Sequence, residues 1–82
     1  MKFRFTPEAR AQLRAIDRAS ALRILEGISR LGLPGAGNVA PLHGDDWPGC
    51  FRLRIGDYRV VFRNAVDAVE ILTVGHRSDV YR

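Results

Sequence analysis

The chain has 82 residues, of which 46% are hydrophobic and 27% charged, the balance of a small globular domain. This length allows a single domain with one core, and no apolar run reaches the roughly 20 residues of a membrane-spanning helix. Residues 1–5 alternate charged and aromatic side chains and do not resemble an apolar leader, so we expect a cytoplasmic protein.

Cysteine and histidine are too few for a disulfide framework or a zinc site. Cys50 is the only cysteine, and His43 and His76 are the only histidines, so we predict no metal and no cofactor. The net charge of +4 comes from 13 basic residues, 12 of them arginine, against 9 acidic ones. That excess favours an anionic partner such as nucleic acid or an acidic protein.

The N-terminal part predicts a short strand followed by a helix. Phe3 and Phe5 flank Arg4 with the alternation of a β-strand. Residues 6–8 read Thr-Pro-Glu, which supplies a capping hydroxyl, a proline for the first helical position and an acid near the positive end of the helix dipole. The apolar stripe expected for this helix is Ala9, Leu13 and Ile16.

A break between residues 17 and 20 separates this helix from a second one, which glycine and proline end at residues 32–35. The predicted stripe of the second helix is Leu22, Leu25, Ile28 and either Leu31 or Gly32. Two antiparallel helices or one bent helix both fit. Residues 32–49 hold five glycines and three prolines, so we predict a loop there.

Three strand-like segments follow at residues 50–55, 58–63 and 69–76. The pair Gly56-Asp57 between the first two suits a two-residue hairpin turn. The order strand, helix, helix, strand, strand, strand predicts an α+β domain with a small, largely antiparallel sheet and both helices packed on one face of it.

The hairpin turn at residues 56–57 sorts the side chains by face, because successive residues of a strand point to opposite sides. The predicted cross-strand pairs are Ile55–Tyr58, Arg54–Arg59, Leu53–Val60, Arg52–Val61, Phe51–Phe62 and Cys50–Arg63. The apolar face is then Phe51, Leu53, Ile55, Tyr58, Val60 and Phe62. The opposite face is Arg52, Arg54, Arg59 and Arg63 around Val61.

Arginines that face each other across strands, as Arg54 and Arg59 do here, destabilise a sheet by about 0.2–1 kcal/mol. A polyanion would reverse the sign of that interaction, and the guanidinium fork suits phosphate oxygens. Any one of these arginines is explained by a solvated sheet face. Four on one face of one hairpin favour binding of nucleic acid or an acidic partner.

Three blocks of the sequence carry a resemblance to a known family: Leu42-x-Gly44, FRLRIGDYRVVFR at 51–63 and VGHRSDVY at 74–81. Together they resemble the RelE/ParE superfamily of toxins from type II toxin-antitoxin modules, and the GDYRV core is more similar to the RelE-like branch. The resemblance implies a RelE-like sheet with two N-terminal helices and an endoribonuclease that cuts messenger RNA in the ribosomal A site. It also implies a cognate antitoxin that masks the basic surface in a hetero-oligomer.

The resemblance assigns roles to individual residues. Its catalytic group is Arg59, Arg77, His76 and Tyr81. Its RNA-binding group is Arg52 and Arg54, joined by Arg63 from the same face. In the family's reaction a ribose 2′-hydroxyl attacks the adjacent phosphate, and Arg59 and Arg77 would stabilise the charge that develops.

Arg52 and Arg54 stand where family members often have lysines, and arginine stays protonated. Proton transfer would therefore fall to His76, whose ordinary pKa suits it, or to Tyr81, which could instead stack on a base. Two other functions remain open: inhibition of DNA gyrase, as in the ParE branch, and an inactive toxin fold that binds only an antitoxin.

Overall fold

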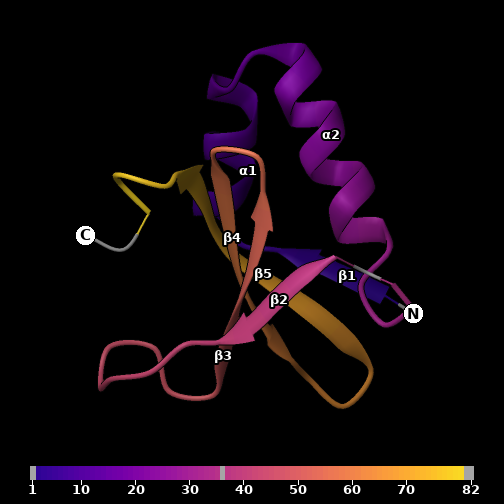
Figure 1. Ribbon diagram of the computed structural model, residues 1–82, viewed down its shortest axis with the longest axis vertical. Helices are drawn as coiled ribbons and strands as arrows, with labels where there is room; N and C mark the ends of the chain where they lie inside the picture. The colour runs from indigo at the N-terminus through magenta and orange to yellow at the C-terminus, as the bar shows by residue number, and fades with distance from the viewer. Residues whose placement is uncertain (1, 36, 81–82) are drawn as a thin grey trace.

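The computed structural model describes residues 2–35 and 37–80. Its elements are β1 (Lys2–Phe5), α1 (Pro7–Ala15), α2 (Arg18–Ser29), β2 (Asn38–Pro41), β3 (Cys50–Ile55), β4 (Tyr58–Asn64) and β5 (Ala68–His76). The strands form one sheet in the order β1-β5-β4-β3-β2, in which β1 runs parallel to β5 and every other pair is antiparallel (Figure 1). The predicted α+β class, with a largely antiparallel sheet, is confirmed.

One strand lies where a loop was predicted. β2 falls inside residues 32–49 and pairs with β3 at the edge of the sheet. It has only four residues and ends at Pro41, which an edge strand tolerates because one side of its backbone needs no ladder hydrogen bond. β3 supplies the hydrogen bonds that make this segment a strand, so its own composition gave no sign of it.

Side-chain caps start both helices, at Thr6 as the sequence predicted and at Asp17 within the predicted break. The Thr6 hydroxyl accepts a hydrogen bond from the Ala9 N–H at 3.0 Å, and Asp17 Oδ2 accepts one from the Ser20 N–H at 3.0 Å. The cap at Asp17 also ends the ambiguity between one bent helix and two helices: there are two. In the part of the chain that the structure describes, no helix is long and apolar enough to cross a membrane.

The core lies between the helices and one face of the sheet. Its buried members are Ala9, Ile24, Ile28, Leu31, Leu53, Val60, Phe62, Val69, Ile71 and Val74. The predicted stripe of α2 was wrong in two positions, because Leu22 and Leu25 are 57% and 40% exposed. Ile24 takes their place in the core.

Gly27 explains which side of α2 faces the sheet. A Cβ atom at this position would lie 2.6 Å from Cδ1 of Ile55, so the helix backbone approaches β3 more closely than a larger residue allows. This contact turns the stripe of Ile24 and Ile28 inward. The predicted leucine stripe also follows helical periodicity and shares Ile28, so periodicity alone could not choose between them.

Candidate nucleic-acid interface

The β3–β4 hairpin has the register expected from its turn, with all six predicted pairs from Ile55–Tyr58 to Cys50–Arg63. The sheet surface away from the helices therefore carries Arg52, Arg54, Arg59 and Arg63, and we call it the arginine face. Gly56 forms the turn with a φ of 56°, a left-handed conformation that favours glycine. Local sequence thus fixes which residues share this face.

A small apolar cluster shares the arginine face. Its buried members are Cys50, Val61 and Val80, and its partly buried members are Leu42, Trp47 and Leu72. Leu72 has no partner in the β4–β5 pairing, because the register shifts between Val61 and Phe62. Trp47 and Cys50 anchor the entry to β3 through this cluster. The guanidinium groups therefore lie beside packed side chains as well as water.

Arg52 is the most unusual of the four arginines. It lies in mid-strand, opposite Val61 and Ala40, and it is half-buried. Its Nη1 is buried and has no hydrogen-bond partner among the described residues. A buried donor without an acceptor costs about 1–3 kcal/mol, and more when it is charged. An anion that reached this nitrogen would remove that cost.

Arg59 folds back toward the turn of its own hairpin. Its side chain is only 8% exposed, and Nη1 donates to the carbonyl oxygens of Gly56 at 2.8 Å and Tyr58 at 2.9 Å. These bonds anchor part of the guanidinium at the tip, so the cross-strand repulsion expected against Arg54 is offset. Arg59 has a structural role in the hairpin that alternation did not reveal.

Arg63 is neutralised within the protein. Its Nε and Nη2 donate to Oε1 of Glu70 at 3.0 and 2.7 Å, and this hydrogen-bonded ion pair raises the pKa of Arg63. Arg63 also lies four residues from Arg59, about 13 Å along an extended strand. It is therefore the peripheral member of the arginine face.

Arg54 and Arg77 are exposed near the tip of the hairpin. The backbone N–H of Arg77 donates to the carbonyl oxygen of Asp57 at 2.8 Å, which ties the turn after β5 to the tip. Val80 then packs on the arginine face. Arg54, Arg59 and the backbone of Arg77 thus lie near the hairpin tip, whereas Arg52 lies in mid-strand on the same face as Arg54.

His76 lies apart from these arginines. It pairs with Tyr58, whose side chain belongs to the helix side of the sheet, and the two rings meet edge to face with centroids 6.1 Å apart. Its Nδ1 is 2.9 Å from the Ser78 hydroxyl and accepts from the Ser78 N–H at 3.3 Å. The fourth predicted catalytic residue, Tyr81, lies outside the described residues.

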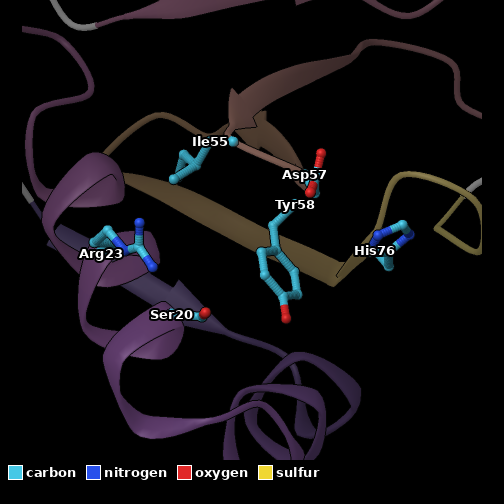
Figure 2. A pocket seen from close by; sticks show the side chains of 7 residues that line it. Ser20, Arg23, Ile55, Asp57, Tyr58 and His76 are labelled. Atoms are coloured by element: carbon cyan, nitrogen blue, oxygen red, sulfur yellow. The ribbon is translucent and has the colours of Figure 1, made fainter.

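A cleft on the helix side of the hairpin tip was not predicted from the sequence, and we call it the tip cleft. Its lining is Ser20, Arg23, Ile55, Gly56, Asp57, Tyr58 and His76. Figure 2 shows the Tyr58 ring in the middle, with Ser20 and Arg23 from α2 on one side and His76 on the other. The sequence offered no signal for it, since α2 and the hairpin tip meet only in the tertiary structure.

Metal binding has no support in this part of the structure. Among residues 2–35 and 37–80, no three histidine, cysteine or acidic side chains are grouped closely enough to hold an ion.

The fold and its basic sheet face define the class of small RelE-like toxins. The toxin-antitoxin complex RelBE2 from Mycobacterium tuberculosis contains a similar chain, with a TM-score of 0.73 and 30% identity over 93% of this chain and 96% of that one. The RelE-RelB complex from Pyrococcus horikoshii OT3 gives a TM-score of 0.75 and 24% identity over 95% and 96%. The chromosomal ParDE system of P. aeruginosa gives 0.68 and 23% over 93% and 95%.

Sequence comparison places the chain more specifically. The family model for the ParE toxin of type II toxin-antitoxin systems, parDE, matches residues 3–81. The chain therefore belongs to this toxin family, and the membership of the RelE/ParE superfamily that three sequence blocks indicated is confirmed. Among curated proteins, none matches the chain.

Proposed function

We propose that this toxin is a ribosome-dependent endoribonuclease of messenger RNA in which a ribose 2′-hydroxyl attacks the adjacent phosphate. The observation that carries the proposal is the buried Nη1 of Arg52, which has no hydrogen-bond partner among the described residues and lies on a face shared with Arg54. A phosphate oxygen is an acceptor of the right charge for that nitrogen. Arg52 then anchors the substrate, and Arg54 holds a flanking phosphate.

In this proposal the developing charge on the attacked phosphate is stabilised by Arg59 and Arg77. We assign proton transfer to Tyr81, on the strength of the family resemblance. His76 is the less suitable candidate, because its ring is on the helix side with Tyr58. Arg63 contributes little, because Glu70 already compensates its charge.

The test maps messenger 5′ ends in a translation reaction with and without ribosomes. We expect new 5′ ends only on ribosome-engaged message, and none with Arg52→Ala. Arg30→Ala is the matched control, because Arg30 is the exposed C-cap residue of α2 and pairs with Glu26 rather than facing the proposed substrate. Message that stays intact with the folded wild-type protein would overturn the proposal.

We also propose an antitoxin partner with carboxylates that cover the arginine face. The two RelE-like relatives described above were solved as toxin-antitoxin complexes, and a carboxylate satisfies Arg52 as a phosphate does. Co-expression with the product of an adjacent reading frame should relieve growth arrest and give a co-purifying complex. Arg52→Ala should weaken that complex.

Inhibition of DNA gyrase is the second candidate. It is favoured by the match to the ParE family model and by the absence of a histidine among the described residues of the arginine face. In this case the purified protein inhibits supercoiling by gyrase, induces DNA damage in cells and leaves message intact. The two assays therefore separate the two targets.

A further inference from the structure

The tip cleft has a volume of about 510 Å³, and its lining holds several polar side chains. Sites for small ligands commonly have 300–1,000 Å³. It lies on the opposite side of the sheet from the arginine face, so the proposed cleavage site does not account for it. Its lining nevertheless carries groups with recognisable binding chemistry.

The walls of the tip cleft are held by the packing of α2 against β3 and by one backbone hydrogen bond. α2 touches β3 at Gly27, against Ile55, and the residues one and two turns earlier on the same helix are Arg23 and Ser20. The opposite wall is the hairpin tip, which the bond from the Arg77 N–H to the Asp57 carbonyl joins to the end of β5. The cleft is thus built from rigid elements on both sides.

The polar groups in the tip cleft are mainly donors. Arg23 is exposed and takes part in none of the three ion pairs of the described residues. Because Nδ1 of His76 accepts from the Ser78 N–H, the neutral imidazole carries its proton on Nε2 and presents a donor there. The Tyr58 hydroxyl can donate as well, whereas the Ser20 hydroxyl is engaged with Asp17.

Aromatic and acidic groups complete the set. The rings of Tyr58 and His76 stand at 80° to each other, and Ile55 adds apolar surface beside them. Stacking of a nucleobase on an aromatic ring is tolerant of sequence. Asp57 offers a carboxylate to sugar hydroxyls. A planar base, a ribose and a phosphate therefore each find a suitable partner.

We infer that the tip cleft binds one nucleotide of single-stranded RNA, with its phosphate on Arg23 and its base against Tyr58. The inference rests on the proposed function only in the identity of the natural ligand. That ligand would be a nucleotide of the messenger RNA that flanks the nucleotide held on the arginine face. The two sites share the hairpin tip, since the carbonyls of Gly56 and Tyr58 that hold Arg59 belong to residues lining the cleft. RNA that passes around the tip reaches both.

Proton NMR of the purified protein tests this inference directly, because the chain has only two histidines. His76 lines the cleft, whereas His43 lies in the loop between β2 and β3. Adenosine 5′-monophosphate should shift the ring resonances of His76 and Tyr58 in a saturable way and leave those of His43 in place. Inorganic phosphate alone should bind more weakly and lack the ring-current shifts of a stacked base.

Two charge reversals on the same helix give the matched comparison. Arg23→Glu should weaken adenosine 5′-monophosphate binding by roughly tenfold or more, because it replaces a charge-assisted hydrogen bond with repulsion. Arg18→Glu makes the same change in charge five residues earlier on α2 and outside the cleft lining, so it should retain binding within about twofold. Equal loss in both variants, equal shifts of both histidines, or no saturable shift would overturn the inference.

The outcome is separable from that of the cleavage assay. If nucleotide binds at the tip cleft but message stays intact, the proposed nucleotide site is supported and the proposed endoribonuclease activity is overturned. If ribosome-dependent cleavage is abolished by Arg52→Ala but nucleotide causes no shift at His76, the proposed endoribonuclease activity is supported and the proposed nucleotide site is overturned.

Discussion

Four arginines follow the same alternation along the β3–β4 hairpin, but each meets a different environment. Arg63 is paired with Glu70, Arg59 donates to the carbonyls of the turn, and Arg52 buries a nitrogen that has no partner among the described residues. Only Arg54 of the four is an ordinary exposed cation. The number of arginines in the sequence pattern is therefore larger than the number of guanidinium groups that are available to a ligand.

Arg59→Ala should destabilise the fold as well as remove a proposed catalytic group. Two hydrogen bonds from the buried guanidinium to Gly56 and Tyr58 are lost, and we expect the free energy of unfolding to fall by about 1–3 kcal/mol. Urea denaturation measures this. Arg54→Ala on the facing strand is the control and should be neutral. Equal stability of the two variants would contradict a structural role for Arg59.

At the level of elements, side chains form hydrogen bonds with the edge of β5 that a neighbouring strand would otherwise form. β1 covers the edge of β5 only as far as Ile71. Beyond that point Thr6 Oγ1 donates to the Leu72 carbonyl at 2.8 Å, and Gln12 Oε1 accepts from the Val74 N–H at 2.7 Å. Helix α1 thus protects the strand that leads into the tip cleft and the turn carrying Arg77.

Gln12→Met should lower the free energy of unfolding by about 1–3 kcal/mol, because it keeps the shape of the side chain but leaves the buried Val74 N–H without an acceptor. Urea denaturation gives the stability, and faster amide exchange at Val74 locates the defect. Gln12→Glu keeps an acceptor oxygen and should stay close to the wild type. A Met variant as stable as the wild type would show that water replaces Gln12.

The cap of α2 should make stability depend on pH. Hydrogen bonds from Ser20, first from its N–H and then from its hydroxyl, hold the pKa of Asp17 below its ordinary value. A lowered folded-state pKa contributes stability above the unfolded-state pKa, and that contribution is lost as pH falls through the folded-state value.

The measurement is the unfolding midpoint of the wild type and Asp17→Asn between neutral pH and roughly pH 3, below the ordinary pKa of aspartate. Asparagine caps the helix without titrating, so the wild type should lose its advantage over this variant in the acid range only. Parallel curves for the two proteins would rule out a titrating cap.

At the scale of the whole molecule, charge and shape place two candidate sites around one hairpin tip. On one side of the sheet, the arginine face carries positive side chains that complement a polyanion. On the other side, the tip cleft has hydrogen-bond donors and aromatic rings. The turn after β5 joins them through the bond between Arg77 and Asp57. RNA binding should therefore depend on some arginines far more than on others.

The salt dependence of binding distinguishes these arginines. With labelled single-stranded RNA whose 2′-hydroxyls are removed to prevent cleavage, Arg54→Ala should reduce the slope of log K against log salt by about 0.7, the loss of one phosphate contact. Arg63→Ala should change it much less, because Glu70 compensates that charge. Fluorescence anisotropy over a range of KCl concentrations measures both, and equal reductions would contradict this ranking.

The sequence by itself determined the features that depend on near neighbours in the chain. The cap at Thr6, the turn at Gly56 and the alternation on both sides of it fixed the start of the first helix, one hairpin and the content of its two faces. These outcomes follow from hydrogen bonds and dihedral angles within a few residues. The motif blocks that indicated the superfamily are likewise short stretches of neighbouring residues.

Only the tertiary structure decided what depends on distant segments. β2 became a strand because β3 supplied its partners, and Gly27 decided which of two equivalent stripes of α2 faced the core. His76 lies on the helix side of the sheet because its register with β4 places it opposite Tyr58. It is therefore separated from the arginines that the sequence analysis had grouped with it. Glu70, the turn carbonyls and the apolar cluster then set the environment of each arginine, because electrostatics and burial act through space and not along the chain.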